Sequence, residues 1–174
     1  MLIRTILQGK FAVVFSLALM VLLSGCATKG DGMASPFGAG KSGTPGIWPI
    51  RHPEATISSP FGMRVQPGTG KTRLHKGVDI RVPEGTPAHV TADGVVTFSG
   101  QQGDYGNVIV VEHGGDLATA YAHLKKRRVD QGQQVRRGQH IGDVGKTGNA
   151  TAPHLHYEVR RGGQPVDPMP YLPR

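Results

Sequence analysis

Apolar residues in the second half of the chain recur at every second position, in short runs. The runs lie at residues 90–92, 95–98, 108–111, 118–121 and 155–159. A period of two is typical of strands that bury one face. Asp-Gly or Gly-Gly steps, which favour tight turns, follow several of the runs. We find no convincing helical period in any longer window, so we predict an all-β domain built from antiparallel strands.

The N-terminal segment has a different pattern. Arg4 and Lys10 precede residues 11–23, an apolar run with one polar residue, Ser16. A helix of that length spans about 20 Å, which is shorter than a hydrocarbon core of about 30 Å. A charged start followed by a short apolar run is typical of an export signal. We predict a signal peptide over residues 1–25.

The end of this run, Leu-Ser-Gly-Cys at residues 23–26, resembles a bacterial lipobox, in which the cysteine becomes an acylated N-terminus. The alternative is an ordinary signal peptide with an incidental cysteine. Acyl chains contribute about 0.8 kcal/mol per buried CH₂, so several of them on Cys26 anchor a protein firmly to a membrane. Ala27, in place of Asp, favours the outer membrane in a cell with two membranes. We predict lipidation at Cys26 and a domain that faces the cell wall from there.

The residues after the signal indicate a linker followed by one domain. Residues 26–47 are rich in Gly, Ser, Thr and Pro and show neither helical nor strand periodicity. A flexible linker of that length has an end-to-end distance of roughly 25 Å. We therefore predict a tether over residues 26–47 and a folded domain over residues 48–174, with its core at about 58–168.

The net positive charge of the chain bears on which binding partners are possible. The chain has 20 Lys and Arg against 12 Asp and Glu, a balance that attracts polyanions. The run 125–128 and the pair 136–137 hold six of these cations. We expect no nucleic-acid partner, because export separates the protein from nucleic acid and no aromatic residues are interleaved for base stacking. A solvated strand edge and a contact with anionic wall polymer or lipid headgroups both remain open.

Histidine supplies the candidate chemistry, because a single cysteine excludes a thiolate zinc cluster. His154 and His156 lie two residues apart, so on a strand both point from the same face. His75 and Asp79 are about 13 Å apart on a flat strand, too far to bind one ion. The chain must bend between them, and at Gly77 a bulge or a positive φ costs least. Converged, one His and one Asp from here with one later His would form an open zinc site of the hydrolytic type.

Three motifs together resemble the signature of the lysostaphin/LytM-type zinc metallopeptidases, which are peptidoglycan endopeptidases. The motifs are His75-x-Gly77-x-Asp79, Tyr121-x-His123 and Pro153-His154-x-His156, and residues 59–64, 83–87 and 138–148 agree with the family as well. The resemblance covers nearly the whole predicted domain. It implies an antiparallel β fold of the lysostaphin-like type, also called the duplicated hybrid motif, and Zn²⁺ as the cofactor.

The resemblance also implies roles for single residues. It makes His75, Asp79 and His156 the zinc ligands, and His123 and His154 the unliganded catalytic histidines. Peptide hydrolysis needs a proton acceptor, a proton donor and positive charge near the oxyanion, and histidine can serve each of these roles. Which of the two histidines serves which role is left open. Tyr121, two residues from His123 and so expected on the same strand face, either binds the oxyanion or substrate or packs in the core.

The four remaining histidines, at positions 52, 89, 113 and 140, are expected to be structural or surface residues. His52 lies just before the domain, where a folded-back fourth ligand is conceivable. Some relatives use an upstream asparagine in this way, but this chain has asparagine only at positions 107 and 149. We predict no such asparagine switch.

The function predicted is that of a membrane-tethered zinc endopeptidase that hydrolyses peptide cross-links of peptidoglycan, most plausibly D,D cross-links. The alternative is a non-catalytic activator of peptidoglycan amidases at cell division on the same fold. Such activators typically lack some of the zinc ligands or catalytic histidines, whereas all five positions are filled here. A plain wall-binding module would not need the histidines of the second motif.

Overall fold

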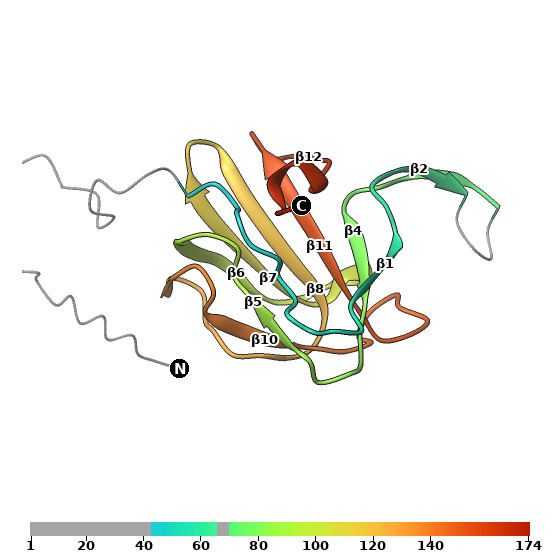
Figure 1. The fold of residues 1–174 in the computed structure, drawn as a ribbon, viewed down its shortest axis with the longest axis horizontal. Coiled ribbons are helices and arrows are strands. Elements are labelled where there is room, and N and C mark those ends of the chain that lie inside the picture. The colour runs from blue at the N-terminus through green and yellow to red at the C-terminus, as the bar shows by residue number, and fades with distance from the viewer. Residues whose placement is uncertain (1–42, 66–69) are drawn as a thin grey trace, which may run out of the picture. The chain divides into compact units, whose positions relative to one another are not determined.

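The computed structural model describes residues 43–65 and 70–174 (Figure 1). The predicted signal peptide, Cys26 and most of the predicted tether lie outside these residues. In the described ranges no helix is long and apolar enough to cross a membrane.

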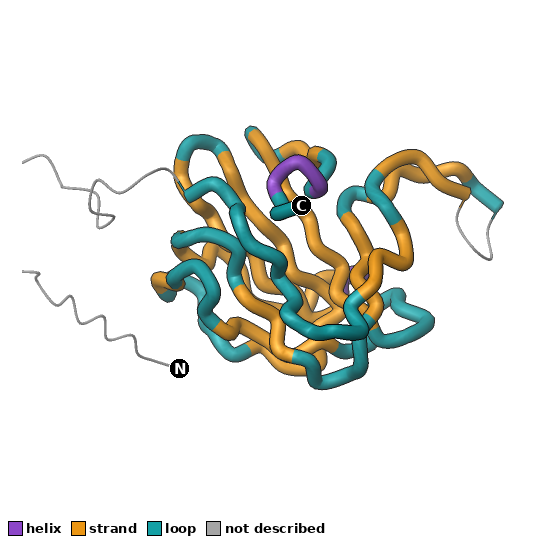
Figure 2. The backbone as a smooth tube through the Cα atoms, viewed as in Figure 1, coloured by secondary structure: helices purple, strands orange, loops and turns teal. Residues whose placement is uncertain are grey.

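Twelve strands and two short 3₁₀ helices make up the described part (Figure 2). In chain order they are β1 Thr56–Ser59, β2 Gly62–Val65, β3 Thr72–His75, β4 Val78–Arg81, β5 Pro87–His89, β6 Gly94–Gln102, η1 Gly103–Tyr105, β7 Gly106–Gly114, β8 Leu117–Arg127, β9 Gln134–Val135, β10 His140–Val144, β11 His154–Arg161, β12 Gln164–Val166 and η2 Met169–Tyr171. The prediction of an all-β fold is confirmed. Four of the predicted strands lie within β6, β7, β8 and β11, whereas Val90 and Ala92 follow the end of β5 and are buried there.

The main sheet is antiparallel and has the order β1-β4-β11-β8-β7-β6-β9. In addition, β12 pairs with β11, and β10 pairs with both β5 and β8. The strands β2 and β3 form a separate hairpin, which projects beyond the sheet next to β1 and β4 (Figure 1). The neighbours β4, β11 and β8 therefore bring the three histidine-containing motifs of the sequence side by side.

The core lies against one face of this sheet and contains two tyrosines that hold a buried hydroxyl network. Tyr121 and Tyr157 are fully buried, and their ring centroids lie 5.4 Å apart. The Tyr121 hydroxyl lies 3.1 Å and the Tyr157 hydroxyl 2.9 Å from the Thr91 Oγ1. Buried polar groups are costly unless they are hydrogen-bonded. This network satisfies both hydroxyls and fixes β8 and β11 relative to the segment after β5.

Contact with the domain begins before the predicted boundary at residue 48. The backbone N–H of Gly46 donates to the carbonyl of Thr91 at 3.2 Å, and Pro45 is buried. A Cβ at Gly43 would lie 2.8 Å from the carbonyl oxygen of Asp93. These contacts are tertiary, so the composition of the segment did not indicate them. Residues 43–47 therefore belong to the folded part.

The basic run at residues 125–128 is largely paired within the domain. The Lys125 Nζ lies 3.0 Å from a Glu84 carboxylate oxygen, and Arg127 donates to the Ser99 Oγ at 2.9 Å. Arg128 makes a two-pronged contact with Asp143, at 2.9 Å from Nε and 2.7 Å from Nη2. Much of the run thus ties β8 to its neighbours. A contact of the remaining cations with wall polymer or lipid stays a prediction.

We expect the Asp143→Asn substitution to lower the free energy of unfolding at pH 7 through loss of its charged hydrogen bonds. Burial raises the pKa of Asp143, but hydrogen bonds from Arg128 and His140 outweigh it and lower that pKa below its usual range. A carboxyl of this kind stabilises the fold above its unfolded pKa of about 3.9 and loses that effect as the pH falls through the folded pKa. Urea unfolding should therefore show a gap between wild type and variant at pH 7 that shrinks below about pH 4. A difference in unfolding free energy that stays constant with pH contradicts a stabilising role of the ionised Asp143 carboxylate.

The bend between His75 and Asp79 is a two-residue connection, Lys76–Gly77, between β3 and β4. The sequence predicts the bend correctly, but Gly77 does not have a positive φ. Glycine is needed there for another reason, since a Cβ would collide with the carbonyl oxygen of Tyr157 and lie 3.0 Å from the Glu158 Cγ. The absence of a side chain lets the connection pass close against β11.

We expect Gly77→Ala to lower the free energy of unfolding by about 2 kcal/mol or more, because overpacking of a well-packed site typically costs 1–3 kcal/mol. Denaturant unfolding measures this effect. Lys76→Ala is the matched control, because Lys76 is exposed in the same connection. Equal stability of the two variants would show that the close approach to β11 is unimportant.

Candidate metal centre

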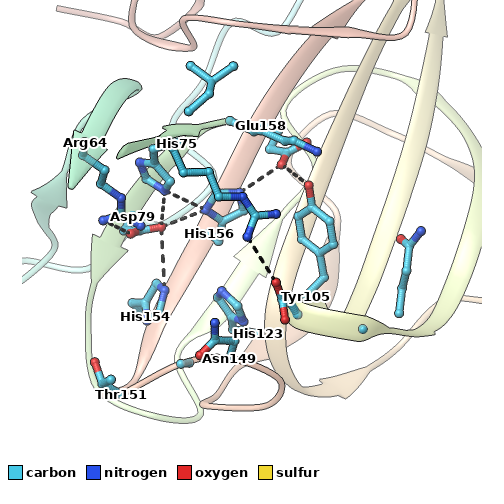
Figure 3. A pocket seen from close by; sticks show the side chains of 17 residues that line it. Arg64, His75, Asp79, Tyr105, His123, Asn149, Thr151, His154, His156 and Glu158 are labelled. Carbon is cyan, nitrogen blue, oxygen red and sulfur yellow. Dashed lines mark hydrogen bonds and ion pairs between the residues drawn. The ribbon is translucent and has the colours of Figure 1, made fainter. Parts of the chain in front are cut away.

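Three strands bring one histidine and one aspartate together with a histidine from a distant part of the chain. His75 is the last residue of β3, and Asp79 lies in β4. His156 in β11 is paired directly with Asp79 in the antiparallel register. All three residues are buried. Figure 3 shows their side chains turned toward one another.

The facing atoms are close enough to share one ion. The Asp79 Oδ1 lies 3.0 Å from the His75 Nε2 and 2.8 Å from the His156 Nδ1. The two nitrogens are 3.1 Å apart. Among the described residues these three form the one group of His, Cys, Asp and Glu side chains with metal-ligand proximity. The structure thus brings together the three residues that the sequence predicts as ligands.

The hydrogen bonds behind the two rings show why this gap suits a cation. The His75 Nδ1 lies 2.7 Å from the carbonyl oxygen of Pro60, so this nitrogen carries the proton. The His156 Nε2 lies 3.0 Å from the Glu158 Oε1, so this nitrogen carries a proton, and with a cation in the gap the Nδ1 is left to bind it. Both rings then present lone pairs to the Asp79 carboxylate, and three acceptors at this spacing repel one another without a positive charge between them. Two nitrogens and one oxygen are the donor set of a hydrolytic zinc site.

The electrostatics around Asp79 point the same way. Burial by itself raises the pKa of Asp79, but hydrogen bonds from His156 and His75, which need ring protons in the gap when no cation is there, outweigh it and hold that pKa well below its usual range. Arg64 adds a further positive charge, with its Nη1 3.6 Å from the Asp79 Oδ2. The carboxylate is therefore ionised and ready to bind a cation.

A buried network behind His156 was missed in the sequence. The Glu158 carboxylate is fully buried, accepts a hydrogen bond from the Tyr105 hydroxyl at 2.6 Å and contacts Arg160. Burial raises the pKa of Glu158, but hydrogen bonds from His156 and Tyr105 outweigh it and lower that pKa to about 2. A signal for this network was present, because Glu158 continues the two-residue alternation of His154 and His156 on β11.

The two histidines predicted to be catalytic lie beside the three-residue group. The ring centroids of His123 and His154 are 4.6 Å apart, and that of His123 is 5.8 Å from that of His156. The His123 Nδ1 donates to the carbonyl of Thr147 at 2.9 Å. The His154 Nδ1 donates to the carbonyl of Ala152 at 2.8 Å, and its Nε2 lies 3.7 Å from the Asp79 Oδ1. Each ring therefore has its Nδ1 engaged by a backbone carbonyl and its Nε2 left for contacts within the site.

His123 reaches this position through a β-bulge. Its neighbours Tyr121 and Leu124 pair with Ile109 and Asn107, so two residues of β8 lie opposite one residue of β7. His123 has a φ of 60°, which is uncommon for a residue other than glycine. Bulges next to active sites redirect a side chain in this way. Burial, followed by the charge of His154, lowers the pKa of His123 to about 4.

The same bulge overturns the expectation that Tyr121 lies on one strand face with His123. The alternation of β8 is broken between the two residues, so Tyr121 points into the core. Its hydroxyl is engaged with Thr91 and Thr119. Tyr121 therefore packs in the core and is not among the residues that line the cavity, so the structure gives no support to a contact of Tyr121 with the oxyanion or with substrate.

A cavity of about 450 Å³ opens over the three-residue group. This size is within the range of small-ligand sites. The five predicted metal and catalytic residues all line it. Arg73 from the β2–β3 hairpin and Asp104 from η1 also line it and lie 3.5 Å apart at the rim. Asn149 and Thr151 from the segment before β11 add further polar lining (Figure 3).

The other four histidines lie outside the lining of this cavity. His113 bonds the carbonyl of Asp93 and the Thr119 hydroxyl, and His140 contacts Asp143. His89 packs against His140, with ring centroids 5.9 Å apart. The His52 Nδ1 accepts from the backbone N–H of Glu54, so the structure gives no support to a fourth ligand at His52.

Comparison with known proteins gives consistent matches. A family model described as peptidase family M23 matches residues 73–168. A DD-carboxypeptidase/endopeptidase Mpg of Neisseria meningitidis serogroup B is 51% identical over 113 residues, which cover 65% of this chain and 26% of that protein. The chain therefore matches about a quarter of the length of this curated relative.

Two solved structures resemble the fold. A zinc containing peptidase from Vibrio cholerae matches with a TM-score of 0.68 and 38% identity, over 74% of this chain and 40% of that one. The catalytic domain of the antimicrobial peptidase lysostaphin from Staphylococcus simulans matches with a TM-score of 0.61 and 32% identity, over 67% of this chain and 91% of that one. The lysostaphin-like fold predicted from the sequence is confirmed.

Proposed function

Because the chain belongs to peptidase family M23, we propose that it is a zinc-dependent endopeptidase that hydrolyses peptide cross-links of peptidoglycan. The observation that carries this proposal is the convergence of three lone pairs, from His75, Asp79 and His156, at the floor of an open cavity. Two further histidines, His123 and His154, lie beside them with their Nδ1 atoms bonded to backbone carbonyls. A wall-binding module has no need of such a group.

The His75 Nε2, the Asp79 Oδ1 and the His156 Nδ1 are the atoms that would hold the zinc ion. When bound, zinc lowers the pKa of its water toward about 7 and polarises a substrate carbonyl. Three protein ligands leave a fourth position open, as in catalytic rather than structural zinc sites. The Asp79 Oδ2 is held separately by the guanidinium of Arg64, so the carboxylate keeps one oxygen directed at the site.

His123 and His154 move the protons of the reaction. With its Nδ1–H bonded to Thr147 and a pKa of about 4, His123 is neutral at pH 7 and begins as a proton acceptor at Nε2. Proton transfer to the leaving amine and stabilisation of the oxyanion need a donor, and the Nε2 of either ring can provide one once it is protonated. The backbone carbonyls of Thr147 and Ala152 fix both rings, so neither has to be ordered during the reaction.

The proposed substrate is a cross-linked stem peptide, with D,D cross-links as the first candidate. The relative from Neisseria is named a DD-carboxypeptidase/endopeptidase, which supports this choice. The cavity is open, and the polar side chains in its walls include Asn149 and Thr151 before β11 and Arg73 on the β2–β3 hairpin. Such walls can hydrogen-bond an extended peptide backbone and its carboxylates.

The proposed place of action is the cell envelope, from a lipid anchor at Cys26 on the periplasmic face of the outer membrane. The support comes from the sequence, through the signal over residues 1–25 and the lipobox-like residues 23–26. The residues up to the folded part act as the tether. Mass analysis of the N-terminal peptide from native membranes should show acylation of Cys26, and an unmodified cysteine there contradicts the anchor.

The bond specificity is tested with defined dimeric muropeptides, one joined by a D,D cross-link and one by an L,D cross-link. We expect conversion of the D,D dimer into monomers and no reaction of the other. A parallel sample contains a peptidoglycan amidase with intact sacculi. If the zinc-loaded protein leaves both dimers intact but accelerates the amidase, the endopeptidase proposal is wrong and the activator alternative holds.

A further inference from the structure

Both oxygens of the buried Glu158 carboxylate make polar contacts. Its Oε1 lies 3.0 Å from the His156 Nε2 and accepts the Tyr105 hydroxyl at 2.6 Å. Its Oε2 lies 2.7 Å from the Arg160 Nε and 2.6 Å from its Nη2. The Glu158 side chain is fully buried, and a buried charge is tolerated only when paired and hydrogen-bonded. Tyr105 and Arg160 thus fix the carboxylate in place while it contacts the His156 ring.

His156 is also the histidine whose ring faces Asp79. An imidazole can present either nitrogen to a metal, and the hydrogen bond of the other nitrogen decides which. Because Glu158 occupies the Nε2 side of His156, the ring directs its Nδ1 to the gap shared with His75. Figure 3 shows the line of contacts from Tyr105 through Glu158 to His156 and on to Asp79.

We propose that Glu158 is a positioning residue for the metal site, which fixes the His156 tautomer that offers Nδ1 to zinc, with Arg160 and Tyr105 holding its carboxylate. This inference rests on the proposed zinc site. Carboxylates bonded behind metal-binding histidines orient the ring and raise its basicity as a ligand, and their mutation typically costs 10–100-fold in metal affinity or activity.

The chain contains a matched control for this arrangement. His140, Asp143 and Arg128 repeat the same chemistry away from the cavity, with the His140 Nε2 2.8 Å from the Asp143 Oδ1 and Arg128 bonded to both carboxylate oxygens. This second group is not part of a candidate metal-binding cluster among the described residues. Asp143→Asn therefore removes a carboxylate from a His–carboxylate–Arg group without touching the site.

The test compares zinc affinity of Glu158→Gln, Tyr105→Phe and Asp143→Asn by competition with a chromophoric chelator. We expect Glu158→Gln to weaken zinc binding by about 10–100-fold. Tyr105→Phe, which keeps the charge and the His156 contact, should weaken it by less, and Asp143→Asn should leave it within about twofold. Visible absorption of the Co²⁺-substituted proteins should change for Glu158→Gln and not for Asp143→Asn, which a general loss of stability does not explain.

Wild-type zinc affinity and an unchanged Co²⁺ spectrum in folded Glu158→Gln overturn the proposal. If that variant fails to fold, ¹⁵N NMR of the wild-type zinc protein decides the question. A His156 ring protonated at Nε2 and metal-bound at Nδ1 supports the positioning role, and the reverse tautomer overturns it. Neither readout needs substrate, so the result is independent of whether the protein cleaves peptidoglycan.

Discussion

Replacing His75 by alanine should abolish cleavage of peptide cross-links together with zinc binding. The substitution removes one of three converging ligand atoms and leaves two. A Lewis acid supplies several kcal/mol of transition-state stabilisation, and each 1.4 kcal/mol is about tenfold in rate. The rate should therefore fall at least about a thousandfold. Release of monomers from cross-linked muropeptides measures the rate, and elemental analysis measures the zinc.

His140→Ala is the control for this prediction. His140 is a partly buried histidine with hydrogen bonds to a carboxylate and a carbonyl, but it lies outside the cavity. This variant should retain zinc and keep its activity within a few-fold of wild type, as far as it remains folded by circular dichroism. Cross-link cleavage by a zinc-free, folded His75→Ala protein contradicts the metal mechanism.

Replacing His123 by alanine should separate metal binding from catalysis. The His123 Nδ1 is bonded to the Thr147 carbonyl, and the ring is not part of the three-residue group. Loss of a general acid or base typically costs about 10²- to 10⁴-fold in rate. Zinc content should stay near wild type while cleavage falls by that factor. The same assays apply as for His75→Ala.

The contrast between the two variants is the informative result. A metal-ligand variant loses both zinc and activity, whereas His123→Ala loses activity alone. Activity of His123→Ala within tenfold of wild type would show that His123 has no role in proton transfer. The proton then moves through His154, whose ring is fixed by the Ala152 carbonyl in the same way.

The strands could be predicted from sequence because they depend on local pattern, whereas the exact set of metal ligands came from the resemblance of the three motifs to a known family. Alternating apolar residues place β6, β7, β8 and β11 at nearly the right residues. The spacing of His154 and His156 shows a shared strand face, and the spacing of His75 and Asp79 shows that the chain must bend between them. The two motifs meet because β4 and β11 pair side by side.

Features that depend on tertiary contact could not be predicted in the same way. The bulge at His123 inserts a residue into β8, so simple alternation misplaces Tyr121. The role of Gly77 depends on the backbone of Tyr157, eighty residues away in the chain. The pairing of Arg128, which follows β8, with Asp143 in β10 likewise depends on tertiary contact, and the charge run alone gave no sign of it.

Glu158 is an intermediate case. Its position two residues after His156 puts it on the same strand face, so a contact with that ring could have been proposed from the sequence. Its complete burial and its contact with Tyr105 could not, because Tyr105 lies in η1, just before β7 and far from Glu158 in the chain.

The most direct test of the central claim is digestion of purified sacculi by the zinc-assayed protein, with His154→Ala alongside. Mass spectrometry of the muropeptides follows the cross-linked dimers over time. The account predicts about one zinc per chain, loss of dimers with wild type, and no loss with His154→Ala. Intact dimers in the presence of folded, zinc-loaded wild-type protein would contradict it.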